Sequence, residues 1–530
     1  MANNIGWGEG NQNNTIGWGK AACNNTIGWG IRYLANIAKS GCGGLIPSFA
    51  LNFNTIADDF TFTRNSFATR VNENGLIETV TNLGENIVVN GDFTNGSANW
   101  SIGSNSEINN GSARIYSPSG SYTFVSQSNV LTIGKTYLIS LEIIEQNSGE
   151  IRLSDGNGYL SNSFSGVGVH TFTSTSIGTI LRIQRTASIT DIRIDNVSVK
   201  EVLENDIPRI DYTTGEGAFL LEPQSTNLVT YSEDFTDSSW INGGSPIITP
   251  NYGTSPDGTQ NSTRIQGSSS ALVATNVMTG ATSGETRSIY VRATSGSGNI
   301  QLTSHNNNTN NVFAIDENWQ RVQTNSLTSL SASTYFSIDM RGASTDIYDI
   351  EVWGAQGEAL DYATSYIPTS GSTVTRSAES CVDATPTINS EEGVLYAEIS
   401  ALADDQTRRG ITLSDGTTSN RVLLRYNTAN NSIQCFAQIG GAVYAAISTT
   451  FYNVTNVNKI AYRYKSGEYA LYINGVEVGT SADITIFPQN TLTQLNFDSN
   501  GSANFYGNTK DLKVYDKALT DEELTELTTI

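Results

Sequence analysis

One segment of the sequence returns about 140 residues later, and this repeat limits the fold more than any other feature. The first copy reads ENIVVNGDFTNGSANW at 85–100, and the second reads TNLVTYSEDFTDSSW at 226–240. Each copy continues for about 110 residues of short alternating strands with turn signals between them, then closes on a strand that begins T-D-I, TDIRIDNVSV or TDIYDIEVW. The aligned residues are Asp92 with Asp234, Phe93 with Phe235, and Trp100 with Trp240. The repeat predicts two β-sandwiches of one type, with turn spacing that suits a jelly roll.

The composition indicates the same fold class for the rest of the chain. Asn, Ser and Thr make up about a third of the 530 residues, Gly adds 49 more, and charged residues are only 15%. Turn formers and β-branched residues at these levels favour sheets over helices, and 530 residues are too many for one core. We therefore expect an all-β protein, with several antiparallel β-sandwich (jelly-roll) domains in series after a short Gly/Trp-rich N-terminal anchor and a small helix.

Charge and residue usage exclude several classes of function. The net charge of −22 leaves no basic excess for phosphate binding, so we expect no nucleic-acid partner. No apolar stretch approaches 18 residues, so we expect no membrane insertion. The start, MANNIGWGEG, has no secretory signal pattern. The two histidines, His170 and His305, are too few for most zinc or triad chemistry. The four cysteines predict free thiols made in a reducing compartment; they are Cys23, Cys42, Cys381 and Cys435.

A second, shorter repeat occupies the N-terminus. I-G-W-G occurs three times and places Trp7, Trp18 and Trp29 at intervals of 11 residues. Each unit reads as an extended piece and a turn that carries one exposed aromatic ring. Three such units cannot bury a core, so 1–44 is either a loose tail or an anchor that orders on a partner or in a homotrimer, with a short helix at its end.

The longer repeat resembles the carbohydrate-binding modules of families four and nine. Their N-G-D-F opening, downstream Trp and closing D-N-V-S-V strand match Asn90 to Trp100 and Asp195 to Val199. The resemblance implies a lectin-like sandwich, often with a structural calcium between its first and last strands. The carboxylates that would hold calcium are Asp92 and Asp195 in the first copy and Asp234 and Asp349 in the second, although an Asp at a strand start also serves as a turn or capping residue.

The two tryptophans of this repeat allow two interpretations. Trp100 and Trp240 could stack on a sugar ring as glycan-binding residues, or each could be a core residue of its sandwich.

Two further segments resemble one consecutive stretch in many bacteriophage tail and head-fibre proteins. They are 60–80, with T-F-T-R and G-L-I-E-T-V, and 208–235, with P-R-I-D-Y and L-L-E-P-Q-S-T-N-L. Because the halves are separated, we infer that the first sandwich is inserted between them. The predicted domains are the anchor 1–44, a split fibre motif or neck of 45–80 with 207–225, a nested sandwich 81–206, a second sandwich 226–380 and a C-terminal sandwich 381–530.

The C-terminal region resembles the laminin-G-like and concanavalin-like family. It contains AYRYKSGEYALYINGVEVG, with turns at Ser466-Gly467 and Asn474-Gly475, and ends in DLKVYDKALTDEELTEL. Two antiparallel sheets should result, with a terminal helix capped by Thr520 and Glu523. Family members often bind glycans or proteins through rim loops, some with calcium, which implies loop carboxylates (Asp404, Asp405, Asp415) that could equally be solvated. The module has no Trp, so sugar stacking would fall to Tyr444, Tyr452 or Tyr506.

No catalytic motif stands out. The nearest pair of acids is Asp349 and Glu351, which alternate along one strand and could flank a glycosidic bond or be a solvated or cation-binding pair.

We expect a non-enzymatic virion fibre or spike, made in the host cytoplasm and exposed on the virion. It would be a homotrimer, attached to other virion proteins by its N-terminus, that binds host-surface or mucus glycans. The alternatives are a head-fibre or decoration protein without a receptor role and a capsule-degrading depolymerase.

Overall fold

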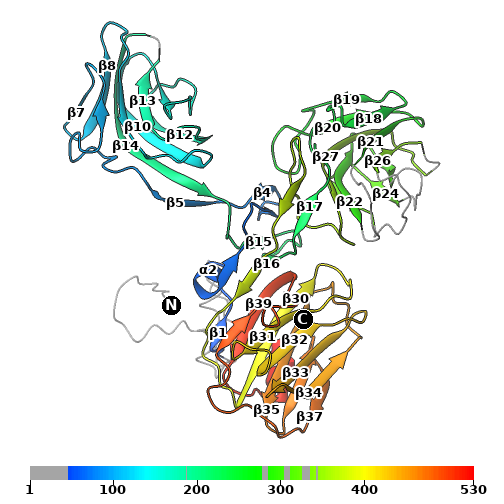
Figure 1. Cartoon of the computed structure of the whole chain (residues 1–530). Helices are drawn as coiled ribbons and strands as arrows, with labels where there is room; N and C mark the ends of the chain where they lie inside the picture. The colour runs from blue at the N-terminus through cyan, green and yellow to red at the C-terminus, as the bar shows by residue number, and fades with distance from the viewer. Residues whose placement is uncertain (1–45, 187, 277–284, 304–310, 325–334, 342–343) are drawn as a thin grey trace, which may run out of the picture. The chain divides into compact units, whose positions relative to one another are not determined.

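The computed structural model describes residues 46–530, except 187, 277–284, 304–310, 325–334 and 342–343. The chain divides into two compact units, 61–381 and 1–60 with 382–530. Antiparallel sheets make up nearly all of each unit (Figure 1), which confirms the all-β prediction. None of the helices in the described part is both long and apolar enough to span a bilayer. Trp7, Trp18, Trp29 and the short helix expected beside them lie outside the described residues.

Residues 82–203 form a sandwich of two sheets. The larger contains β12 (Gly168–Thr175), β10 (Thr136–Ser148), β14 (Thr190–Leu203), β8 (Ser112–Ser117) and β7 (Glu107–Asn109), with β5 (Asn82–Asn86) on β14. The smaller contains β11 (Ile151–Ser154), β13 (Leu181–Arg185), β9 (Phe124–Gln127) and β6 (Ser101–Ile102). Alternate residues of the central strands, such as Ile139, Leu141 and Ile143 of β10, are buried between the sheets.

A second sandwich follows, with five strands in each sheet. One contains β18 (Trp240–Gly243), β21 (Leu272–Asn276), β26 (Tyr335–Asp339), β23 (Gly298–Thr303) and β24 (Asn311–Ile315). The other contains β19 (Ile247–Thr249), β20 (Thr263–Gln266), β27 (Asp349–Glu358), β22 (Thr286–Ala293) and β25 (Gln320–Gln323). The core again lies between the two sheets.

The two sandwiches share a contact that the sequence repeat specifies. Trp100 packs against Phe93 and donates its Nε1–H to the backbone oxygen of Asn90, while Trp240 packs against Phe235 and donates to Tyr231. Aligned residues therefore make equivalent contacts in the two copies.

Short strands from both halves of the split segment lie together in unit 61–381. The first half supplies β2 (Thr61–Thr63), β3 (Thr69–Val71) and β4 (Ile77–Thr79), and the second supplies β15 (Arg209–Asp211), β16 (Ala218–Leu221) and β17 (Ser225–Asn227). Two strands that follow the second sandwich, β28 (Val374–Arg376) and β29 (Ser380–Val382), pair with β17 and β2. The backbone N–H of Val71 donates to the Asp211 carboxylate at 2.8 Å, and that of Arg64 donates to Asp206 at 2.6 Å. The two halves meet in space, although residues 81–206 separate them in the sequence.

A buried cluster of charges joins these segments. The Arg209 guanidinium lies 2.6 Å from Glu379 and 2.8 Å from Glu222, Arg376 lies 2.6 Å from Glu222, and Arg64 lies 2.9 Å from Glu379. All five side chains are 0–2% exposed. Burial would raise the pKa of Glu222, but the charges of Arg376 and Arg209 and hydrogen bonds from Ser365 lower it to about 2. The Glu222 carboxylate therefore stays ionised in the folded protein.

The other unit contains the C-terminal sandwich. Its first sheet contains β1 (Phe49–Ala50), β39 (Gly507–Tyr515), β30 (Glu392–Ala401), β35 (Asn458–Lys465), β36 (Tyr469–Ile473) and β37 (Val476–Ser481). Its second contains β34 (Ala442–Thr449), β33 (Ile433–Ile439), β32 (Arg421–Tyr426), β31 (Arg409–Ser414) and β38 (Gln494–Asn496).

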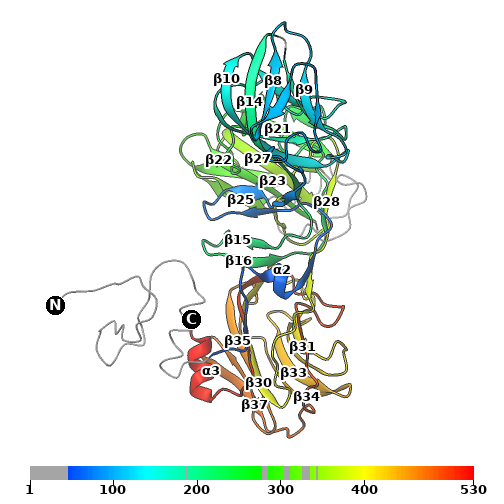
Figure 2. The same cartoon turned by 90° about the vertical axis from the view of Figure 1, so that its left-hand side faces the viewer.

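The turn and the helix cap predicted near the C-terminus are both present in the structure. The β36–β37 turn has positive φ at Asn474 and Gly475, +52° and +81°, as an Asn-Gly turn requires. Helix α3 (Asp521–Thr528) begins at a capping box made by Thr520 and Glu523. It packs on the sheet that contains β30, β35 and β37, and not on the β31–β34 sheet (Figure 2).

The stretch 46–60 differs from the predicted neck, because it packs with the C-terminal sandwich. β1 pairs with β39, and helix α2 (Ile56–Asp59) precedes Phe60, whose ring lies 5.4 Å from that of Phe497. Apolar side chains at Phe49, Ile56 and Phe60 drive this docking, since burial of each removes apolar surface from water.

We predict that Glu379→Gln destabilises unit 61–381 by about 3–5 kcal/mol, because it leaves the buried Arg209 and Arg64 without a full counter-charge. Faster hydrogen exchange in the 61–80 and 207–225 peptides would report this loss. As the matched control, Glu78→Gln removes the partly exposed Arg70–Glu78 pair and should change stability by at most about 1 kcal/mol. Equal effects of the two changes would contradict the prediction.

Candidate functional site

The structure places Trp100 and Trp240 in the sandwich cores. They are 7% and 3% exposed, and each indole N–H is used by a backbone carbonyl. Neither ring has a free face for a sugar, so the stacking interpretation is corrected in favour of the core one. The physical reason is that a bulky aromatic beside the first strand fills the end of the sandwich.

The carboxylates proposed for calcium do not form a ligand set in the first sandwich. Asp92 is exposed and accepts from the backbone and hydroxyl of Thr94, which is the turn role. Burial raises the pKa of Asp195, and the nearby charges of Glu142 and Asp92 add to this. Among the described residues, no group of three or more His, Cys, Asp or Glu side chains could hold a metal ion. The residues present therefore do not fit a calcium site.

In the second sandwich, the two carboxylates proposed for calcium, Asp234 and Asp349, are engaged by other side chains. Asp234 repeats the turn role with Thr236. Asp349 accepts two hydrogen bonds from Arg264, at 2.8 and 2.6 Å, and these bonds lower its pKa. Its counterpart by contacts is Asp191, which accepts two bonds from Arg114 at 2.6 and 2.8 Å. The match of Asp349 with Asp195 was therefore wrong. Asp349 corresponds to Asp191, and its charge is neutralised by Arg264.

The acid pair Asp349 and Glu351 is not arranged for hydrolysis. Glu351 is 5% exposed and accepts from Arg292 at 3.0 and 3.2 Å and from the Ser262 hydroxyl at 2.7 Å. With both carboxylates held by arginines, neither is positioned as an acid that could donate a proton to a leaving group.

The three tyrosines proposed for sugar stacking in the C-terminal sandwich, Tyr444, Tyr452 and Tyr506, are all partly buried. Tyr444 lies on β34 opposite Ala437, on the core side of the sheet. Tyr452 donates to the Ile473 backbone at 3.3 Å, and Tyr506 accepts from Asn504 at 3.1 Å. Burial raises the pKa of Tyr452. These contacts orient the rings as parts of the module.

An aromatic surface that the sequence did not reveal covers the smaller sheet of the first sandwich. Cross-strand pairing places Leu153, Ile183 and Val125 in one row, and all three are 0% exposed. Because neighbouring rows point to opposite faces, the row of Arg152, Gln184 and Phe124 faces outward. We call this surface the aromatic face; it comprises Arg152, Tyr159, Arg182, Gln184, Phe124 and Tyr122.

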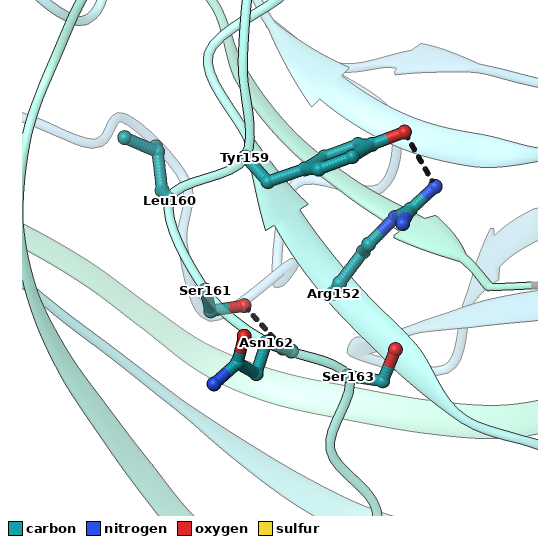
Figure 3. A pocket seen from close by; sticks show the side chains of 6 residues that line it. All are labelled: Arg152, Tyr159, Leu160, Ser161, Asn162 and Ser163. Carbon is teal, nitrogen blue, oxygen red and sulfur yellow. Dashed lines mark hydrogen bonds between the residues drawn. The ribbon is translucent and has the colours of Figure 1, made fainter.

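One end of the aromatic face is a recess of about 490 Å³ beside β11. Figure 3 shows the Tyr159 ring alongside the Arg152 guanidinium, with Ser161, Asn162 and Ser163 on the following loop. The guanidinium carbon lies 3.6 Å from the ring centre, and Arg152 Nη2 donates to the Tyr159 hydroxyl at 2.7 Å. Tyr159 is still 62% exposed, so an aromatic surface fixed by a cation remains open to a ligand.

The other end of the aromatic face is built in a similar way. The Arg182 guanidinium lies 5.1 Å from the Phe124 ring, which lies 5.5 Å from that of Tyr122. The Tyr122 hydroxyl donates to Gln184 at 3.0 Å. Among the described residues, no ion pair uses Arg152 or Arg182, and the Nε of each is buried without a hydrogen-bond partner. The face offers aromatic rings and guanidinium groups without a counter-charge, the chemistry that suits polar rings such as sugars.

A second recess, of about 650 Å³, lies at one end of the second sandwich. Burial raises the pKa of Glu233, and the charge of Asp257 adds to this, although the Tyr366 hydroxyl donates to Glu233 at 2.8 Å. Asn261 donates to both carboxylates, at 3.3 and 3.2 Å. These acids are therefore satisfied by donors from the protein itself.

Comparisons with known proteins agree with a lectin-like architecture. Residues 396–525 match the family model described as the concanavalin A-like lectin/glucanases superfamily. The C-terminal sandwich is thus a concanavalin-like lectin domain, as its sequence predicted. No curated protein matches the chain.

Several solved structures are similar to parts of the chain at low identity. Domain 4 of AbnA, an extracellular GH43 arabinanase from Geobacillus stearothermophilus in complex with arabinotriose, is 15% identical (TM-score 0.25; 32% of this chain, 84% of that one). The CBM22-1–CBM22-2 tandem of Paenibacillus barcinonensis Xyn10C is 11% identical (TM-score 0.24; 52% and 98%). Domains LG4-5 of the mouse laminin alpha1 chain are 10% identical (TM-score 0.19; 54% and 92%).

We predict that Trp100 and Tyr159 respond differently to truncation. Trp100→Ala should destabilise the first sandwich by about 3–5 kcal/mol, because it leaves a cavity beside Phe93. Tyr159→Ala should change stability by no more than about 0.5 kcal/mol, because the ring is mostly exposed. Hydrogen exchange in peptides from β10 and β14 measures both effects. Similar protection in the two variants would contradict the core assignment of Trp100.

Proposed function

We propose that the chain binds glycans through the aromatic face of its first sandwich. The observation that carries the proposal is the exposed Tyr159 ring, held by Arg152 at the edge of a recess with hydroxyl and amide side chains. A pyranose could stack its C–H surface on this ring while its hydroxyls exchange hydrogen bonds with Ser161, Asn162 and Ser163.

We further propose that the protein is a bacteriophage fibre or spike. The support is the resemblance of 60–80 and 208–235 to phage fibre proteins, together with the IGWG repeat. In this proposal the N-terminus attaches to the virion and the chain is a homotrimer. Three copies of a shallow site would then act together, and tethering raises the effective affinity by roughly 10² to 10⁴.

Tyr159→Ala should weaken binding to glycans at least about fivefold, because stacking on one aromatic ring is worth about 1 kcal/mol or more. The measurement is binding of the full chain to an array of bacterial-surface and mucus glycans. Phe451→Ala is the matched control, since it removes a ring that is 87% exposed on the other unit. Unchanged binding in Tyr159→Ala would rule out the aromatic face as the site.

The virion assignment has its own test. Mass spectrometry of purified phage particles should detect this chain as a structural component, and an antibody against it should block adsorption to the host. A particle that lacks the chain would contradict the assignment and leave the glycan test unaffected.

A further inference from the structure

A second outward-facing surface, on the C-terminal sandwich, carries three arginines. On the β31–β34 sheet, the residues that point inward are buried, among them Ile411, Val422 and Cys435. The alternate rows lie on the opposite face of the sheet. They contain the partly buried Arg421 beside Gln438 and Arg425 beside Gln434, and the row between them holds Phe436, which is only 3% exposed. Helix α3 packs on the other sheet of this sandwich (Figure 2). We call Arg408, Arg421 and Arg425 the arginine patch.

Neutral side chains hold these arginines in place. Arg421 donates from Nε to Gln438 at 2.9 Å and from Nη1 to the Ser499 hydroxyl at 2.7 Å. Arg425 donates from Nε and Nη2 to Gln434 at 3.0 and 2.6 Å. Both guanidinium groups lie over the Phe436 ring, at 5.9 and 5.1 Å from its centre. The third arginine, Arg408, donates to Asn427 at 3.2 Å.

The patch has no counter-charge of its own. Burial lowers the pKa of Arg421; burial and the positive charges of Arg408 and Arg421 lower that of Arg425. Within the described residues, no ion pair joins a carboxylate to any of the three.

The acids of the neighbouring loops have other partners. Asp405 pairs with Arg409 at 2.5 Å, Asp404 accepts from the Asn431 backbone, and Asp415 accepts from Asn420 and Thr417.

This arrangement is unexpected for a chain with 51 acidic and 29 basic residues. In the second sandwich, two arginines beside aromatic rings are neutralised: Arg264 is bound by Asp349 and Arg292 by Glu351. Three like charges kept near one another without a carboxylate repel each other, and an anion from outside relieves this repulsion.

We propose that the arginine patch binds the carboxylates of an acidic polysaccharide, one built from uronic acids. The proposal rests on the glycan-binding function above and names the substrate class for the C-terminal module. A guanidinium fork matches a carboxylate with two parallel hydrogen bonds. Because Gln434, Gln438 and Phe436 already fix two of the forks, little side-chain entropy is lost on binding.

The chemistry around the patch favours a uronate chain over a denser polyanion. A uronate polymer carries one charge per sugar, and its ring can pack on Val443, which is 54% exposed and lies opposite Gln438. Double-stranded DNA carries a charge about every 1.7 Å along its axis, so it would also meet the acidic remainder of the surface.

The test is binding of the full chain to two uronate polymers, alginate and polygalacturonate, with neutral dextran and dextran sulfate as comparison polymers. Arg421→Gln with Arg425→Gln should weaken uronate binding at least about tenfold, the usual effect of losing a hydrogen bond to a charged group. Lys135→Gln with Lys465→Gln is the matched control, because it removes the same charge elsewhere on the surface and should keep uronate binding. Arg421→Lys with Arg425→Lys keeps the charge without the fork and should restore only part of the affinity.

Each outcome decides the proposal. Loss of uronate binding in the glutamine variant, with the control unaffected and thermal unfolding unchanged, supports it. Absence of uronate binding, equal binding by the glutamine variant, equal loss in the lysine control, or equally tight dextran sulfate binding overturns it. Neutral-glycan binding that still depends on Tyr159 would show that the proposed function stands when this inference fails. If Tyr159→Ala changes nothing while the glutamine variant loses uronate binding, the inference stands and the aromatic face is wrong.

Discussion

The buried cluster of three arginines and two glutamates is the constraint on which unit 61–381 depends. Its members come from three separate stretches of the sequence: Arg64 precedes the first sandwich, Arg209 and Glu222 follow it, and Arg376 and Glu379 follow the second. Removing a charge from water costs several kcal/mol unless its partners are present, so all three stretches must be in place together. The motif residues of segments 60–80 and 208–235 include Arg64, Arg209 and Glu222. Their shared role in this chain is to close one fold around a sandwich inserted between them in the sequence.

The two repeated sandwiches share core contacts but differ in the side-chain contacts on their surfaces. Both retain the Phe–Trp contact and an arginine–aspartate pair at the T-D-I strand or beside it. Their exposed arginine–aromatic contacts differ, however. Arg152 stacks on Tyr159 without a carboxylate in the first copy, whereas Arg292 over Trp319 is bound by Glu351 in the second. At these two positions, the arginine is paired with a carboxylate in the second copy and is not paired in the first.

The same distinction links the aromatic face and the arginine patch. In both, alternate rows of a sheet place guanidinium groups beside aromatic rings. Uncharged side chains accept part of their hydrogen bonds: the Tyr159 hydroxyl in the aromatic face, and Gln438 and Gln434 in the arginine patch. In a chain of net charge −22, such surfaces are local exceptions to the acidic field. They would favour ligands with hydroxyl and carboxylate groups, which is the chemistry proposed for this protein.

Local sequence determined much of the framework. Alternating apolar residues, an Asn-Gly turn at Asn474 and a capping box at Thr520 specify elements from neighbours within a few residues, so the all-β class, the β36–β37 hairpin and helix α3 could be predicted. Tertiary structure decided the sites. Whether Trp100 faces a sugar or a core, and whether Asp349 is free or bound by Arg264, depends on strand register between distant segments. Arg152 and Arg425 gained their roles in the same way, because cross-strand pairing sets which row faces outward and which carboxylates lie within reach.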